Sequence, residues 1–167
     1  CSNPNGHMFD FSIIDTLRNL CKSLIVVVDT TWTPELNVLE LGADAIALSL
    51  TKHHSGSSCI MGAVISKNYP GIANEVSEWI RLSGGHISPY DSSKLLTKLD
   101  SFTERINNAY NETLKLANLM EDKDWVLEVN YPLLRSNKSY DLANKYKIRP
   151  TVLHVLVDIP GSKRNVD

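Results

Sequence analysis

Four residues at the ends of two apolar runs carry side chains that could do chemistry together. Asp29 ends a run rich in valine, and Ser49, Thr51 and Lys52 lie at the end of the next apolar run. A lysine amine can form a Schiff base with an aldehyde, and hydroxyls can donate hydrogen bonds to phosphate oxygens. A carboxylate at the carboxyl end of a buried strand lies where ligands bind in open α/β sheets.

Each of these residues also has a simpler interpretation when taken alone. Asp29 could be an ordinary turn or helix-capping aspartate, and Lys52 could be a solvated lysine at a strand end. In an extended chain, Ser49 and Thr51 share one side and Lys52 points to the other. The combination favours a pyridoxal phosphate site. In such a site an acid keeps the pyridine nitrogen protonated, hydroxyls hold the phosphate and a lysine holds the aldehyde.

The segments around these residues alternate between strand-like and helix-like patterns. The strand-like runs are apolar and β-branched, and the first of them, at 24–30, is typical of a strand buried on both faces. Alternation of this kind predicts an α/β fold with a mostly parallel sheet and flanking helices. The expected strands are 24–30, 45–50 and 61–66, and the expected helices are 10–23 and 36–42.

The second half of the chain is more helical. An amphipathic helix is expected to end near Gly84, and the apolar positions of 88–122 continue at helical spacing for about nine turns. We therefore predict one long connecting helix over 88–122. Beyond it, 125–132 and 151–159 are strand candidates that flank a helix at 139–147.

Composition excludes several classes of protein and partner. The chain has 167 residues, of which 43% are hydrophobic and 22% charged, and its net charge is −2. These values indicate a globular domain and argue against a nucleic acid or membrane partner. The odd number of cysteines favours free thiols and a cytoplasmic location. The adjacent His53 and His54 point in different directions and have no partner cluster, so we expect no metal site.

The segment "VVVDTTWTPELNVLELGADAIALSLTKHHSGSSCIMGAVIS" resembles the cofactor-binding segment of the Cys/Met-metabolism family of pyridoxal-phosphate enzymes. This family includes cystathionine γ-synthase, cystathionine β-lyase, cystathionine γ-lyase and methionine γ-lyase. The shared pattern is a D-N-T-[FW] strand end, a "LELGAD" segment and S-x-T-K-x-x-x-G. "SNPNGHMFD" and "GGHISPYDSSKLLTKLDSFTERI" are similar to the family segments upstream and downstream.

The resemblance implies a role for each candidate site residue. Lys52 would bind the cofactor aldehyde and later carry protons, so it would be the catalytic residue. Asp29 would pair with the pyridinium nitrogen of pyridoxal 5'-phosphate, and Ser49 and Thr51 would bind its phosphate. Asn3, in the S-N-P segment, would lie near the cofactor ring or the substrate carboxylate.

The resemblance also implies an architecture. Residues 1–87 would form part of the large domain of a fold-type I pyridoxal-phosphate transferase. Residues 88–122 would be the connecting helix, and 123–167 would begin an α+β C-terminal subdomain. Family members are longer, and Cys1 is not a translational start, so we expect the chain to be a piece of a longer enzyme.

The implied function is that of a carbon–sulfur lyase or transsulfuration enzyme acting on a small amino acid, as a cytoplasmic dimer or tetramer of identical chains. "DTTW" and "EVNYPLLRSNKSYD" favour the cystathionine β-lyase branch over the γ-synthase branch. The alternative hypothesis is a truncated, catalytically inactive relative that acts as an interaction or assembly module. Labelling of Lys52 by the cofactor distinguishes the two.

Overall fold

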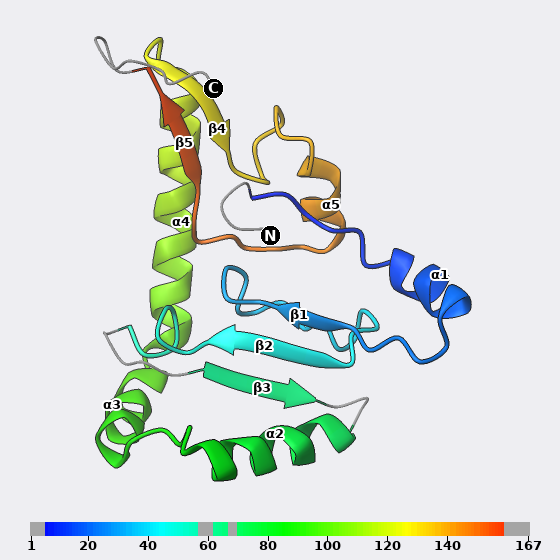
Figure 1. Cartoon of the computed structure of the whole chain (residues 1–167). Coiled ribbons are helices and arrows are strands. Elements are labelled where there is room, and N and C mark those ends of the chain that lie inside the picture. Colours follow the sequence, from blue (N-terminus) through cyan, green and yellow to red (C-terminus); the bar gives the residue numbers. More distant parts are fainter. Residues whose placement is uncertain (1–5, 57–61, 67–69, 159–167) are drawn as a thin grey trace. The chain divides into compact units, whose positions relative to one another are not determined.

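A computed structural model describes residues 6–56, 62–66 and 70–158 (Figure 1). The chain divides into two compact units. One consists of Phe9–Asn108 and is called the Lys52 unit below. The other combines Cys1–Met8 with Ala109–Asp167 and is called the Tyr131 unit. Asn3 and Cys59 lie outside the described residues, and the three-part division expected from the resemblance stays a prediction.

The Lys52 unit contains a sheet whose described strands follow the order β1-β2-β3. They are β1 (Val27–Asp29), β2 (Ala45–Ser49) and β3 (Gly62–Ser66), close to the three strands predicted. β1 and β2 are parallel, as expected from the α/β pattern, whereas β2 and β3 are antiparallel. The parallel pair brings the carboxyl ends of β1 and β2 to the same edge of the sheet.

The first strand is more exposed than its valine-rich sequence predicts. The side chain of Val27 is 53% exposed and that of Ile25 is 45% exposed. The prediction of a strand buried on both faces is therefore wrong for the described residues. The physical reason is that, among the described elements, β1 makes close contact only with β2, so no helix layer covers its two faces. The buried apolar residues of this unit are instead Phe11, Ile14, Val38, Ala43, Ala45, Ile46, Leu48 and Ile106.

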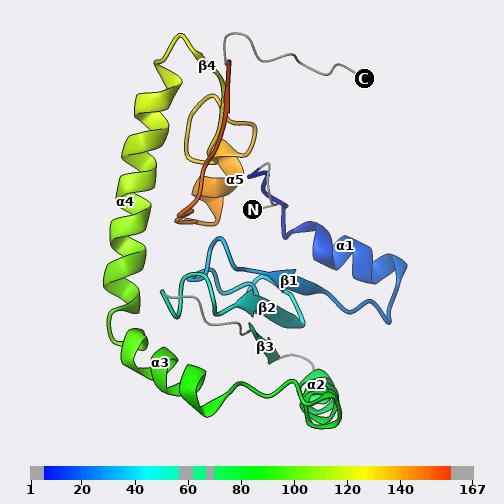
Figure 2. The same ribbon diagram turned by 60° about the vertical axis from the view of Figure 1, so that its left-hand side comes forward.

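Two of the helices expected in this unit form as predicted. α1 spans Ile13–Leu20 and α2 spans Pro70–Ser83. α2 runs alongside β3 (Figure 1), which is the described strand farthest from β1 in the sheet, and Figure 2 shows this helix end-on. The helix expected over 36–42 is wrong, because this segment forms successive turns. Gly42 takes a φ of 101°, which closes the last turn before β2 in a conformation that residues with a side chain rarely adopt.

The single helix predicted over 88–122 is also wrong. The range holds two helices, α3 (Pro89–Leu99) and α4 (Phe102–Glu121). In an unbroken helix the Lys98 carbonyl would accept from the amide four residues later. In this structure that carbonyl accepts instead from the guanidinium of Arg105 at 3.1 Å and from the hydroxyl of Ser101 at 3.2 Å. Two side chains thus satisfy a carbonyl at the end of α3, where the helix breaks.

The Tyr131 unit contains an antiparallel pair, β4 (Val126–Asn130) with β5 (His154–Val157), and the helix α5 (Tyr140–Lys145). These elements match the predicted strand, helix and strand. Tyr131 is fully buried, and its hydroxyl donates to the Pro150 carbonyl at 2.9 Å. The core around it is formed by Ala117, Tyr131 and Leu134, with Leu114, Val129, Leu133 and Leu153 packed against them. No helix in the part of the chain described is long and apolar enough to cross a membrane.

Candidate active site

Asp29 and Ser49 lie at the same edge and on the same face of the Lys52-unit sheet. Asp29 is in register with Ala47 of the neighbouring parallel strand, so their side chains share a face. Ser49 is two residues beyond Ala47 and therefore faces the same way. The structure thus brings together two of the predicted site residues, although they are 20 positions apart in the sequence.

The turn after β1 is hydrogen-bonded to the end of β2. The carboxylate of Asp29 accepts from the amide of Thr31 at 2.7 Å, and the carboxylate group is exposed. The hydroxyl oxygen of Thr31 in turn accepts from the amide of Ser49 at 2.9 Å. The hydrogen bond of Asp29 is the one expected of an ordinary turn aspartate. Its position at the strand end, with an exposed carboxylate, is also what the cofactor hypothesis requires.

Lys52 lies in a compact turn formed by residues 50–56, called the Lys52 turn below. The amide of Ser55 donates to the carbonyl of Leu50 at 2.8 Å. The Ser55 hydroxyl donates to the carbonyl of Thr51 at 3.0 Å, and Ser55 is fully buried. The side chain of Lys52 itself is exposed. The turn is therefore held from inside by Ser55, and it presents the lysine amine outward.

One geometric expectation for these residues is wrong. Thr51 and Lys52 were predicted to alternate with Ser49 along an extended chain, but β2 ends at Ser49 and the chain turns there. The amide of Lys52 lies 3.4 Å from the Ser49 carbonyl, which closes the first bend. Thr51 is half-buried. Which side chains face one another is therefore set by the turn and not by strand alternation.

The surface beside Asp29 suits a flat aromatic ring. On the face that Asp29 shares, β2 presents the small side chains of Ala47 and Ser49. Ser49 is paired with Gly62 of β3, which has no side chain. The exposed side chain of Val64, which is paired with Ala47, borders this surface. A carboxylate and a hydroxyl on one face fit the ring nitrogen and the phosphate of pyridoxal phosphate.

Arg105, from the first turns of α4, contacts the Lys52 turn. Its Nη1 donates to the His53 carbonyl at 2.6 Å and its Nη2 to the His54 carbonyl at 2.9 Å. The His54 ring also stacks on Phe102, with ring centroids 4.4 Å apart and planes 15° apart. The backbone carbonyls after Lys52 are thus bound by one arginine, and the His54 side chain stacks on one aromatic ring.

The folded structure disfavours the charged form of both histidines in the Lys52 turn. Burial lowers the pKa of His53, with further contributions from His54 and Arg105. Burial also lowers the pKa of His54, and the Arg105 guanidinium adds to the effect. The unfolded chain therefore binds more protons than the folded chain at pH values below about 6.5, the ordinary histidine pKa.

We expect the free energy of unfolding of the Lys52 unit to fall as the pH drops from 7 toward 5. The contribution of the two histidines is fully present above the unfolded pKa and is lost as the pH falls through the folded pKa values. Urea unfolding at several pH values measures this. The doubly substituted His53→Gln, His54→Gln chain should show a flatter profile, whereas His86→Gln, at an exposed position, should keep the original one. Identical profiles for all three proteins would contradict the assignment.

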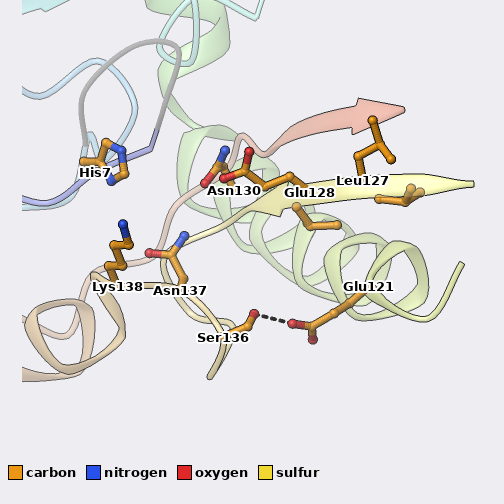
Figure 3. Close-up of a pocket in the computed structure, with 10 residues that line it drawn as sticks. His7, Glu121, Leu127, Glu128, Asn130, Ser136, Asn137 and Lys138 are labelled. Atoms are coloured by element: carbon orange, nitrogen blue, oxygen red, sulfur yellow. Dashed lines mark hydrogen bonds between the residues drawn. The ribbon is translucent and has the colours of Figure 1, made fainter. Parts of the chain in front are cut away.

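A separate pocket of about 410 Å³ lies in the Tyr131 unit (Figure 3). Side chains of both charge signs line it, including Glu121, Glu128 and Lys138, and the Ser136 hydroxyl donates to Glu121. None of the predicted site residues lines it. Within 6–56, 62–66 and 70–158, no group of three or more His, Cys, Asp or Glu side chains is arranged to hold a metal ion.

Sequence reasoning did not identify Thr31 and Arg105 as parts of this site. Thr31 could have been found from its position, because a threonine two residues after a strand-end aspartate can bond to the neighbouring strand. Arg105 carries no such local signal, since its bond to the His53 carbonyl joins residues 52 positions apart.

Comparison with known proteins shows similarity to one family of pyridoxal-phosphate enzymes. The family model described as "Cys/Met metabolism PLP-dependent enzyme" matches residues 1–159. The chain is 31% identical to an L-methionine gamma-lyase from Pseudomonas deceptionensis over 86% of this chain and 37% of that protein. It is 32% identical to a cystathionine beta-lyase from Neurospora crassa over 72% of this chain and 26% of that protein.

A solved structure with the same fold is that of cystathionine gamma-lyase from yeast. The two structures align with a TM-score of 0.82 at 26% identity. The alignment covers 93% of this chain and 42% of the yeast protein. The chain therefore has the α/β fold of these enzymes and spans well under half the length of the relatives that it matches.

Proposed function

The chain belongs to the Cys/Met metabolism family of PLP-dependent enzymes, and from this premise we propose that it carries the lysine-bearing part of their active site. The enzyme would break or exchange a carbon–sulfur bond in a small amino acid. One observation carries the assignment of the site: Asp29 and Ser49 share one face at the carboxyl end of two adjacent parallel strands, directly before the turn that bears Lys52.

The proposed roles follow from the chemistry of each side chain. The Lys52 amine forms the covalent attachment to the cofactor aldehyde. The Asp29 carboxylate accepts a hydrogen bond from the protonated ring nitrogen, while the Ser49 and Thr51 hydroxyls bind the phosphate. Asn3 is proposed, from the resemblance alone, to lie near the ring or the substrate carboxylate. The bond from the Thr31 amide fixes the Asp29 carboxylate at the sheet edge.

When bound, pyridoxal phosphate supplies an electron sink for a carbanion at the substrate α-carbon. Lys52, which would hold the aldehyde of the cofactor, would also act on the substrate as a general base and acid. Its amine would take the α-proton and return a proton to the product. Asp29 would keep the ring nitrogen protonated throughout, because a carboxylate beside the nitrogen favours the charged form.

The substrate class and setting are also part of the proposal. The two curated relatives above are named as a methionine gamma-lyase and a cystathionine beta-lyase, so a sulfur-containing amino acid is the substrate class that we propose. Assembly into dimers or tetramers of identical chains follows the family resemblance. A cytoplasmic location is supported by Cys21, which is an exposed free thiol.

Borohydride trapping tests the proposed function. We expect the full natural chain to develop a visible absorbance band with pyridoxal phosphate, and reduction to fix the cofactor on Lys52. Peptide mass spectrometry locates the label, and exposed lysines such as Lys22 and Lys115 serve as internal controls in the same sample. Labelling spread evenly over the lysines, or no band at saturating cofactor, would favour the alternative of an inactive interaction module.

A further inference from the structure

We propose that Arg105 is a positioning residue for Lys52: its guanidinium holds the Lys52 turn in the conformation from which the lysine amine captures the cofactor. This inference rests on the proposed function of Lys52. Arg105 does not act on the substrate or cofactor itself. It acts through the backbone of His53 and His54, the two residues that follow the lysine.

The guanidinium of Arg105 makes four hydrogen bonds at one junction. Two go to the successive carbonyls of His53 and His54, at 2.6 and 2.9 Å. The other two go to the Lys98 carbonyl at 3.1 Å and the Ser101 hydroxyl at 3.2 Å. The planar fork of an arginine can satisfy several acceptors in fixed directions, whereas a lysine amine is a point charge on a flexible stem. The turn is thereby fixed to the end of α3 and the start of α4.

Gly56 allows the guanidinium of Arg105 to lie close to the backbone of the Lys52 turn. A Cβ atom at Gly56 would lie 2.7 Å from Nη1 of Arg105, nearer than atoms pack. Gly56 also has a φ of 55°, a conformation that strains residues with a side chain. An end of the Lys52 turn is therefore shaped to accept the guanidinium. The turn would have to give up this geometry if either Arg105 or Gly56 were replaced.

The contacts place the constraint on the backbone next to Lys52 and leave its side chain outward. Ser55 is fully buried and closes the turn from inside, while the Lys52 side chain is exposed. A turn held at its carbonyls limits the directions that the amine can reach. Loosening it should slow covalent capture of an aldehyde. Noncovalent binding of the ring and phosphate should change much less, because Asp29 and Ser49 lie outside the turn and only the proposed Thr51 contact lies within it.

Two forms of the cofactor distinguish a positioning role of Arg105 from a general loss of folding. Pyridoxal phosphate has the aldehyde that Lys52 captures, whereas pyridoxamine phosphate has the same ring and phosphate but no aldehyde. We expect Arg105→Ala to slow covalent attachment to Lys52 by about 10-fold or more, since hydrogen bonds from a charged donor are lost. The dissociation constant for pyridoxamine phosphate should rise by a much smaller factor, about threefold at most, because Asp29 and Ser49 keep their positions and only the proposed Thr51 contact is loosened.

Companion variants sharpen the test in the full natural chain. Arg105→Lys keeps the charge but not the fork, so its attachment rate should be closer to that of Arg105→Ala than to that of the natural protein. Gly56→Ala should reproduce the slowing while Arg105 itself is kept, because the new Cβ displaces the guanidinium. Arg81→Ala, which removes an exposed arginine paired with Glu78, is the matched control and should attach the cofactor at the natural rate.

Hydrogen exchange gives a readout that needs no cofactor. The amides of residues 50–56 should exchange faster in Arg105→Ala than in the natural protein. A natural attachment rate in Arg105→Ala, or an equal loss of both cofactor forms, would overturn the positioning role. If the natural protein attaches the cofactor at no particular lysine, the proposed function fails, and the exchange experiment still decides whether Arg105 holds the turn.

Discussion

Replacing Lys52 with alanine should abolish covalent attachment of pyridoxal phosphate and lower carbon–sulfur bond cleavage by on the order of 10⁴-fold, the upper range for loss of a general acid–base group. The alanine has no amine to bind the aldehyde or to carry the α-proton. Absorbance spectra with pyridoxal phosphate measure the first effect. Release of thiol from a sulfur-containing amino acid, followed with a thiol reagent in the full natural chain, measures the second.

Two comparisons distinguish lost chemistry from lost structure. Because the Lys52 side chain is exposed and projects from a turn closed by Ser55, the alanine variant should fold normally, which circular dichroism can check. Small alkylamines added to the variant should restore part of the activity by supplying the missing base. Lys22→Ala, at another exposed lysine of the same unit, should behave like the natural protein.

Lys52→Arg addresses the role of charge alone. A guanidinium keeps the positive charge at this position but stays protonated and does not form the covalent bond. We expect it to be as inactive as the alanine variant. Activity within about tenfold of the natural protein in either variant would contradict a covalent role for Lys52, because a lost covalent and acid–base group costs far more than that.

The parts of the site that could be predicted depend on residues that are close together in the sequence. Apolar runs that stop at a polar residue located the ends of β1 and β2, and parallel pairing then brings Asp29 and Ser49 to one edge. The family of the chain could also be recognised, because the segment from Asp29 to Lys52 is continuous. These features depend on neighbours in the chain, which a sequence displays directly.

The parts that could not be predicted depend on contacts between distant residues. The apolar periodicity of 88–122 continues through Asp100 and Ser101, and it conceals the one local sign of a new helix, which is Ser101 followed by Glu104 three residues later. The break coincides with a bond from Arg105 to the Lys98 carbonyl, and the same side chain reaches the Lys52 turn. One arginine therefore contacts both the missed helix boundary and the missed part of the site.

A second large effect is expected at Asp44, which is only 8% exposed. Its Oδ2 accepts from Arg18 of α1 and from the amide of Val26, both at 2.7 Å. Its carbonyl accepts from the hydroxyl of Ser66 in β3 at 3.0 Å. Asp44 thus joins α1, the chain entering β1, and β3 just before β2 begins.

Asp44→Ala should lower the free energy of unfolding of the Lys52 unit by about 2 kcal/mol, because it leaves the half-buried Arg18 side chain and the Val26 amide without their acceptor. Asp44→Asn keeps an acceptor oxygen but not the charge, so its loss should be smaller. Glu78→Ala removes an exposed ion pair with Arg81 and should change stability little. Urea unfolding followed by circular dichroism compares the three, and equal midpoints for Asp44→Ala and the natural protein would contradict this account.

Asp44 and Lys52 lie at opposite ends of β2, which allows stability and chemistry to be separated in one strand. At low temperature, where Asp44→Ala remains folded, borohydride should still fix the cofactor on Lys52, because the turn contacts of Arg105 and Ser55 are intact. Lys52→Ala should show the reverse pattern, with a natural unfolding midpoint and no trapping. Loss of trapping in folded Asp44→Ala would mean that the start of β2 also controls the geometry of the Lys52 turn.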